Sequence, residues 1–387
     1  MNDARRGSHG VQVNTEGDIM KASAEKFLLY TPEIEAIRAN EQEVSAQIAD
    51  TMRRISTAVG DQFRHTMRPV HAKSHGLLRA KLTIEGDVPE QYRQGLFAEP
   101  GTFDAIVRLS TTPGDILPDS VSSPRAWAIK VIGTPEAAAT LPGHEQHHTQ
   151  DFLCQTGKAF GVADAEAFLK QTLFFEKHAT DSATLKEAVS TAARLAESAI
   201  EAVGGRIGTL RKLGYPETHI LGESFYSQTP LRYGNYIAKI AFVPASKNLI
   251  ALKDKKLGHS GNYSALRDAV VRFFKTEGAE WNVCAQLATD LDKTPIEDAS
   301  VAWPEELSPY VTVARLTAEP QEAYSAARRI FVDEHLSFSP WHGLLAHQPL
   351  GNINRARKLA YRAAASLRRT REDRREIEPT SIDELPE

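Results

Sequence analysis

Apolar side chains recur at every second position over much of residues 78–131. Three runs show the pattern, each bounded by Gly, Pro or Asp: Leu78, Ala80, Leu82 and Ile84; Ala105, Val107 and Leu109; Trp127, Ile129 and Val131. Successive side chains of a strand point to opposite faces, so this alternation is typical of strands with one buried face. Similar runs lie at 236–243, 281–288 and 310–316. The sequence therefore predicts an α+β fold, an antiparallel sheet or barrel that carries helical insertions.

Helical signals lie on both sides of these strands. Thr31, Pro32 and Glu33 supply an N-cap, a first-turn proline and an acidic first turn, which predict a helix from there to Gly60. An apolar stripe along this segment is formed by Ile34, Ile37, Val44, Ile48, Met52, Ile55 and Val59. Residues 163–205, 262–276 and 319–331 also have helical patterns, and a last helix is expected after Gly351, through to Arg369.

Composition allows one large domain or two smaller ones in the 387 residues. The predicted organisation is a polar N-terminal segment (1–30), a single folded domain (31–369) and a charged tail (370–387) that we expect to be solvated. The net charge of -4 argues against a nucleic-acid partner. We find no apolar run long enough to span a bilayer, so a cytoplasmic protein is the default expectation. Cys154 and Cys284 lie far apart in the sequence, which favours two buried, reduced thiols.

Two segments near the predicted strands carry side chains suited to chemistry. The first runs from Arg68 to Gly76 and contains His71; a loop histidine is more often a structural hydrogen-bonding residue than a catalytic one. The second is Val107-Arg108-Leu109-Ser110-Thr111, in which the strand period puts Arg108 and Ser110 on the same face.

The last predicted helix carries a tyrosine among arginines. Residues 357, 361, 364 and 368 fall on one helical face, so Arg357 can reach the Tyr361 oxygen, and Arg368 follows two turns later. A guanidinium favours the phenolate over the phenol, and so does ferric iron, so the pattern suits a tyrosine-ligated haem. Taken alone, the pattern is more typical of a basic, solvated amphipathic helix with Tyr361 packed on the core.

Six segments, in order, resemble the haem catalase superfamily over residues 65–370. Val70-His71-Ala72-Lys73 resembles the distal-histidine loop, Val107 to Thr111 resembles the strand that supplies the distal serine, and Arg357 to Tyr361 resembles the proximal helix. The other matches are Pro124-Arg125-Ala126-Trp127-Ala128-Ile129-Lys130, Val301-Ala302-Trp303-Pro304 and Phe338-Ser339-Pro340. The resemblance implies a catalase-like barrel with a C-terminal helix that faces a haem b, and it points to the compact, catalase-related peroxidase branch.

The resemblance also implies a role for each matching residue. Tyr361 would be the proximal iron ligand with Arg357 as its charge partner, and His71 would be the distal acid and base, oriented by a hydrogen bond from Ser110. Arg forks bind carboxylates bidentately, which suits three arginines matched to the haem propionates. These three are Arg68, Arg108 and Arg368, and the other implied haem contacts are Val70 and Phe160.

One segment departs from the catalase pattern at the distal side. Catalases carry Asn-Asn-Thr-Pro, whose second Asn holds the peroxide; aligned on Asp151 and Phe160, this chain has Gln155-Thr156-Gly157-Lys158. Thr156 then replaces the amide with a shorter side chain that has a single donor. The long N-terminal arm of catalase tetramers has no obvious counterpart, which leaves the presence of a homo-oligomer open.

The leading hypothesis is therefore a haem peroxidase acting on hydrogen peroxide or an organic hydroperoxide, with an organic co-substrate that the sequence does not identify. One alternative is a fatty-acid hydroperoxide isomerase related to allene oxide synthase, or another haem oxidation in a pocket widened by Thr156 and Gly161. Those isomerases place Thr before the distal His, whereas this chain has Val70. Another alternative is a haem-binding protein without turnover, which would have no need of His71.

Overall fold

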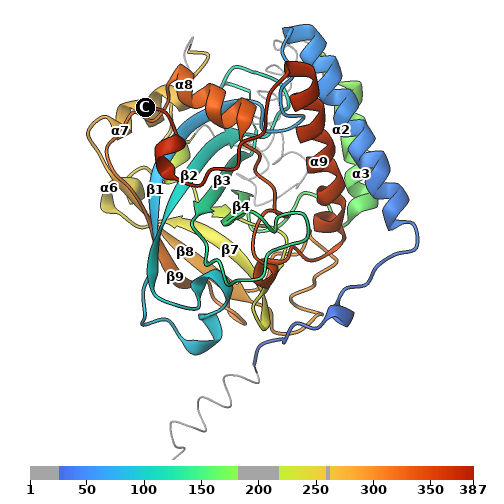
Figure 1. Ribbon diagram of the computed structural model, residues 1–387, viewed down its shortest axis with the longest axis vertical. Helices are drawn as coiled ribbons and strands as arrows, with labels where there is room; N and C mark the ends of the chain where they lie inside the picture. Colours follow the sequence, from blue (N-terminus) through green and yellow to red (C-terminus); the bar gives the residue numbers. More distant parts are fainter. Residues whose placement is uncertain (1–25, 122, 182–217, 259–261) are drawn as a thin grey trace, which may run out of the picture.

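The strands form one antiparallel sheet in the computed structural model, which describes residues 26–121, 123–181, 218–258 and 262–387 (Figure 1). Eight strands hydrogen-bond in a closed cycle, in which β5 pairs with both β4 and β7, and β6 extends β7 as a short hairpin. The predicted barrel is confirmed. The strands are β1 (Ser74–Ile84), β2 (Gly101–Thr111), β3 (Arg125–Ile132), β4 (Thr149–Thr156), β5 (Phe225–Tyr226), β6 (Leu231–Tyr233), β7 (Tyr236–Pro244), β8 (Ala279–Leu287) and β9 (Val311–Ala318).

The barrel interior is filled by the alternating residues that predicted the strands. Trp127 lies at its centre, with ring centroids 5.0 Å from Trp281 and 5.3 Å from Phe242. Cys154 and Cys284 are buried free thiols, as expected. Side chains of the opposite parity point out of the barrel, so β2 presents Ile106 to a separate outer apolar cluster that also contains Leu77 and Val332.

Three helices form a layer beside the barrel, as Figure 1 shows: α2 (Glu41–Phe63), α3 (Ala165–Lys177) and α9 (Asn352–Glu372). In the described part of the chain, no helix is both long and apolar enough to cross a membrane. The shorter helices are α6 (Lys247–Ile250), α7 (Ala265–Phe274) and α8 (Ala326–Arg329), and the 3-10 turns are Pro32–Ile34, Glu90–Tyr92, Gly95–Phe97, Ile220–Gly222, Leu345–His347 and Ile382–Glu384.

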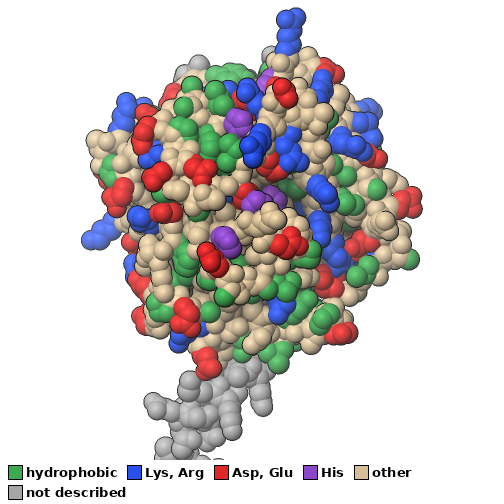
Figure 2. All heavy atoms as spheres, viewed as in Figure 1, with side chains coloured by type: hydrophobic (Ala, Val, Ile, Leu, Met, Phe, Trp, Pro, Cys, Tyr) green, Lys and Arg blue, Asp and Glu red, His purple; other side chains and the backbone are tan. Residues whose placement is uncertain are grey.

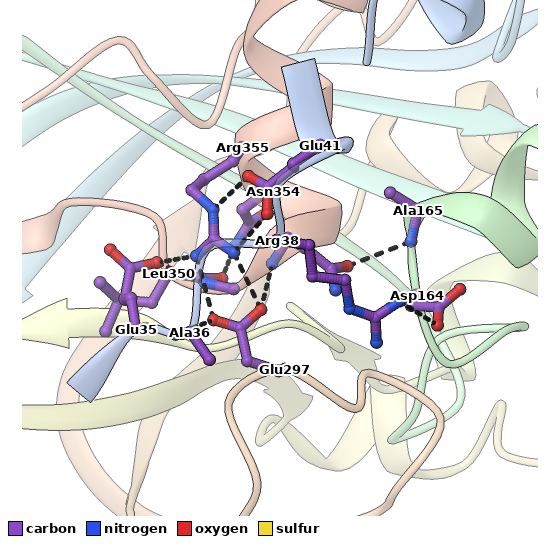
Figure 3. A network of polar contacts seen from close by, with 12 residues as sticks. Glu35, Ala36, Arg38, Glu41, Asp164, Ala165, Glu297, Leu350, Asn354 and Arg355 are labelled. Carbon is purple, nitrogen blue, oxygen red and sulfur yellow. Dashed lines mark hydrogen bonds and ion pairs between the residues drawn. The ribbon is translucent and has the colours of Figure 1, made fainter. Parts of the chain in front are cut away.

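The first predicted helix starts later than its sequence signals indicate. Pro32–Ile34 forms only a 3-10 turn, and Glu35 has an extended backbone before α2 begins at Glu41. Figure 3 shows the cause: Arg355 of α9 lies between the carboxylates of Glu35, Glu41 and Glu297. Ala36 N also donates to Glu297 Oε1 at 3.0 Å. These tertiary contacts override the local helix signal of Thr31, Pro32 and Glu33.

Other predicted helices are confirmed over shorter spans. The 163–205 pattern corresponds to α3, and its portion beyond residue 181 lies outside the described residues; the 262–276 pattern corresponds to α7. The 319–331 prediction is wrong at its start, because Gln321 bonds to the edge of β1 through Arg79 N and O. Only α8 forms there, followed by a π-helical turn, Ile330–His335. The pattern search missed β4, which is buried and polar at several positions.

The residues after α9 are packed, which contradicts the expected solvated tail. Leu385 is 0% exposed and lies in the outer apolar cluster with Leu77 and Ile106. Glu378 accepts a hydrogen bond from the buried Lys130 at 2.6 Å. The C-terminus lies next to α7 and α8 (Figure 1). The segment therefore covers the outer face of β2, and its high charge is used in ion pairs rather than in solvation alone.

Leu385→Ala should lower the free energy of unfolding by about 2–5 kcal/mol, because it leaves a cavity in this cluster. Leu291, which is 47% exposed, offers a matched control, and Leu291→Ala should change stability by less than about 0.5 kcal/mol. Urea denaturation measures both. Equal effects of the two substitutions would show that the C-terminal segment is not part of the folded core.

Candidate active site

A shared apolar cluster joins two of the regions that carry the candidate residues, α9 and the segment before β1. It joins Ile48 and Met52 of α2 to Ala356 and Ala360 of α9, and Val70 packs against it. Small alanine side chains allow α9 to approach α2 closely, which places Tyr361 and the segment before β1 in the same part of the molecule. Figure 2 shows that Lys, Arg and His side chains gather over the face where α9 borders the barrel.

Close contacts of Gly351 and Asn354 fix the start of α9. A Cβ on Gly351, whose φ is +84°, would lie 2.4 Å from Ile296 O, so no larger residue is accommodated there. In the first turn of the helix, the buried Asn354 amide donates to Pro230 O at 2.9 Å and Leu350 O at 3.0 Å. The helix therefore has a set position relative to the barrel.

Tyr361 and Arg357 make the contact that the helical spacing predicted. Arg357 Nη2 donates to the Tyr361 oxygen at 3.1 Å, and Arg357 Nη1 donates to Asn354 Oδ1 at 3.0 Å. Asn354 thus orients the guanidinium that contacts the phenol.

His71 lies just before β1 in a backbone conformation that is rare for residues with a Cβ. Its φ is +58°, in the left-handed region. The segment is tied to the end of β2, because His71 N donates to Thr112 O at 2.8 Å and Ala72 N donates to Pro113 O at 3.0 Å. The direction of the imidazole is therefore set by an unusual backbone held from both sides.

The imidazole of His71 is neutral. Burial lowers its pKa to about 3, the charges of Arg108, Arg357 and Arg68 contribute to this shift, and a backbone hydrogen bond with Thr111 opposes it. The effect of Arg357 on His71 also shows that the distal and proximal candidates lie within electrostatic reach of each other.

The three predicted arginines gather around Asp333, which lies in the π-helical turn. Arg108 Nε and Arg68 Nη1 donate to Asp333 Oδ1 at 2.7 and 3.1 Å. Burial alone would raise the pKa of Asp333, but Arg108 and Arg68 lower it below its usual value, so the carboxylate is charged. Burial lowers the pKa of Arg368 to about 10, and its Nε is buried without a hydrogen-bond partner. Two guanidinium groups therefore pair with one carboxylate here, and the charge of Arg368 also interacts with it.

The register of the sheet corrects the expected distal residues. Ser110 pairs with Ala126, and Ala126 pairs with Gln155, so the side chains of this row share the outer face of the barrel. Thr156 has the opposite parity; its Oγ1 accepts from Arg125 N at 3.3 Å. The side chain of Thr156 thus lies on the inner face at the end of β4, and its role beside His71 stays a prediction. Gln155 Nε2 donates at 2.9 Å to Oγ1 of Thr112, whose carbonyl accepts from His71 N.

Two further expectations concern Ser110 and Phe160. The predicted hydrogen bond between Ser110 and His71 is not formed, because Ser110 lies opposite Ser74, the first residue of β1 and three residues after His71. The ring of Phe160 contacts that of Phe168 on α3 edge to face, with centroids 5.4 Å apart. Because Phe168 packs on the apolar cluster of α2 and α9, Phe160 lies at the border of the same region.

Comparison with known proteins addresses the fold. No protein-family model and no curated protein sequence matches the chain. Among solved structures, a fungal catalase is similar with a TM-score of 0.55 at 16% identity, over 81% of this chain and 61% of that one. Catalase A from Saccharomyces cerevisiae gives 0.56 at 15% identity, over 80% of this chain and 63% of that one. A bacterial catalase gives 0.55 at 16% identity, over 96% of this chain and 67% of that one.

This chain has a catalase-like fold. The matched part amounts to about three-fifths of the length of the fungal and yeast catalases. The order of barrel strands, outer helices and C-terminal helix agrees with the expectation from the six sequence segments. At these identities the similarity concerns the fold, so the chemistry has to be argued from the side chains of this chain.

Those side chains fit a haem. Arg68, Arg108 and Arg368 carry three positive charges against the single negative charge of Asp333, and the excess of two equals the charge of two propionates. The unpartnered Arg368 Nε is a buried polar atom that a bound ligand could satisfy. Tyr361, whose oxygen accepts from Arg357, offers the type of oxygen ligand that ferric iron binds.

Sequence reasoning missed Asp333, Asn354 and Gln155. Asp333 follows a segment with a helical pattern, and neither that pattern nor its neighbour Glu334 distinguishes it from a solvated acidic residue. Gln155 could have been found, because Phe152 and Cys154 face the barrel interior and the strand period then turns Gln155 outward.

The folded protein should become less stable as the pH is lowered, because folding favours the neutral form of His71. Its pKa is about 3 when folded and 6.5 in the unfolded chain, so the unfolded chain binds more protons between these values. This contribution is complete above the unfolded value and is lost as the pH falls below it. When the pH is lowered from about 7 to about 5, the free energy of unfolding of His71→Gln should therefore fall by roughly 1–2 kcal/mol less than that of the wild type.

Urea denaturation at the two pH values measures the difference. His148 is exposed, so His148→Gln should show the same loss as the wild type. If His71→Gln and the wild type lose equal stability, His71 is not held neutral by its surroundings.

Proposed function

We propose that this chain is a haem-dependent peroxidase, in which Tyr361 is the iron ligand and His71 is the acid–base residue. The proposal depends mainly on one observation. An arginine-paired tyrosine and a neutral histidine lie within electrostatic reach of each other, beside a buried cluster with two excess positive charges. The catalase-like fold is consistent with this arrangement.

On the proximal side, Arg357 places a positive charge at the oxygen of Tyr361, which would bind the iron as a phenolate. Its guanidinium is oriented by Asn354, so the charge is in place before any ligand binds. When bound, a haem held by this phenolate would supply the iron redox chemistry with peroxide. Arg68, Arg108 and Arg368 would pair with its propionates, and Val70 and Phe160 would contact its apolar surface.

On the distal side, His71 moves a proton. A neutral imidazole can accept the proton of a bound hydroperoxide and return it to the departing oxygen atom. The low pKa of His71, caused first by burial and then by Arg108, Arg357 and Arg68, favours the return of the proton. Gln155 adds amide hydrogen-bonding capacity on the outer face of the barrel, in the same row as Ser110 and separated from it by Ala126. An organic co-substrate would supply the reducing equivalents.

Tyr361→Phe should bind haem more weakly and lose the optical spectrum of a tyrosinate-ligated ferric haem, because the oxygen ligand is removed. Tyr236→Phe is the matched control on β7 and should keep the wild-type spectrum. Haem titration of the purified protein, followed by absorbance, measures both variants. A Tyr361→Phe variant with the wild-type spectrum would rule out Tyr361 as the ligand.

His71→Ala should keep haem but consume hydrogen peroxide about 10²–10⁴-fold more slowly, because the general acid–base group is missing. Stopped-flow mixing with peroxide gives the rate, and His148→Ala is the control at an exposed position. Wild-type peroxide consumption by His71→Ala would favour a haem-binding protein without distal catalysis. Organic reductants and a fatty-acid hydroperoxide, tried in parallel, distinguish peroxidase from isomerase activity by their products.

A further inference from the structure

We infer that Asp333 is a positioning residue for His71, acting through Arg108. The inference rests on the proposed function for its catalytic meaning, but the positioning itself is a property of the chain alone. Asp333 does not contact the imidazole. It would act by fixing the guanidinium that holds the backbone of His71.

The side chain of Asp333 accepts three hydrogen bonds from three parts of the chain. Its Oδ1 accepts from Arg108 Nε at 2.7 Å and Arg68 Nη1 at 3.1 Å, and its Oδ2 accepts from Ser74 Oγ at 2.7 Å. All three donors belong to the start of β1, the segment before it, or β2. Charge-assisted bonds of this kind are stronger and more directional than neutral ones, so the carboxylate fixes how Arg108 lies.

The other end of the same guanidinium holds the carbonyl of His71. Arg108 Nη2 donates to His71 O at 2.7 Å, and Arg108 is 2% exposed. The left-handed conformation of His71 is unfavourable for a residue with a Cβ and persists only where the surroundings enforce it. Thr112 O fixes the N–H side of His71, and Arg108 fixes its carbonyl side. Release of the carbonyl would let the imidazole turn.

The π-helical turn explains why Asp333 alone has this position. Such turns are rare and occur often at functional sites. In this turn, the adjacent carboxylates serve different partners: Asp333 binds Arg68 and Arg108, whereas Glu334 pairs with Arg329 at 3.2 Å and with Arg374 at 3.1 Å. Glu334 therefore offers a matched control, a neighbouring carboxylate with arginine partners that do not contact His71.

A purely structural role would predict a different outcome from a positioning role. If Asp333 only balances buried charge, its neutralisation should lower stability without a specific effect on His71. If Asp333 positions His71, Asp333→Asn should shift the imidazole. The arginines should still bind carboxylates, because the substitution makes their surroundings more positive.

The first measurement uses the protein without haem. Carbon-13-labelled histidine gives ring C–H signals in NMR spectra, and the His71 signal is assigned by its loss in His71→Gln. Asp333→Asn should displace or broaden this signal, and Glu334→Gln should leave it unchanged. Arg108→Lys keeps a cation but cannot bridge Asp333 and His71 O, so it should act like Asp333→Asn and serves if that variant does not fold.

The second measurement uses haem-loaded protein. In Asp333→Asn, the rate of peroxide consumption and the association rate of cyanide, which must give up a proton to bind, should both fall about 10- to 100-fold. Haem affinity should not weaken, and Glu334→Gln should match the wild type in all three. An unshifted His71 signal in a folded Asp333→Asn or Arg108→Lys variant overturns the inference. Failure of the wild type to bind haem contradicts the proposed function instead, and leaves the NMR result to decide the role of Asp333.

Discussion

Three buried guanidinium groups around a single carboxylate are the constraint on which the site depends. Arg68, Arg108 and Arg368 come from three segments that are far apart in the sequence, and Asp333 is the negative charge that lets Arg68 and Arg108 lie close together. Like charges brought together away from water repel each other strongly, so this cluster is incompletely balanced. Burial, with the excess positive charge, keeps His71 neutral, and the same excess charge suits an anionic ligand.

The barrel provides the rigid support for this cluster. Its alternation sends Leu109 and Val107 inward and Arg108 and Ser110 outward, which gives β2 a packed face and a polar one. The π-helical turn and the C-terminal segment cover the outer face, with Val332 and Leu385 in one apolar cluster. On the far side, Ala356 and Ala360 bring α9 against α2 and Val70. Tyr361 and His71 are thus held by two packed layers rather than by loops alone.

Sequence reasoning predicted the parts of this structure in which residues recur at the spacing of a strand or a helix. Strand alternation predicted most of the barrel, and helical spacing predicted the contact between Arg357 and Tyr361. It failed where tertiary contacts decide. The ion pair of Arg355 with Glu35 prevents the first helix from starting where its sequence signals indicate. Leu385 is buried within a C-terminal segment whose charges predicted a solvated tail. Asp333 had no local signal, since a carboxylate reveals a buried role only once its arginines are placed around it.

Resonance Raman spectroscopy of the protein titrated with ferric haem tests the central claim most directly. The account predicts saturation at one haem per chain, with tyrosinate vibrations enhanced by excitation into the ligand-to-iron charge-transfer band. Haem uptake without saturation, or a saturated complex that lacks tyrosinate vibrations, would contradict ligation by Tyr361 and with it the proposed peroxidase.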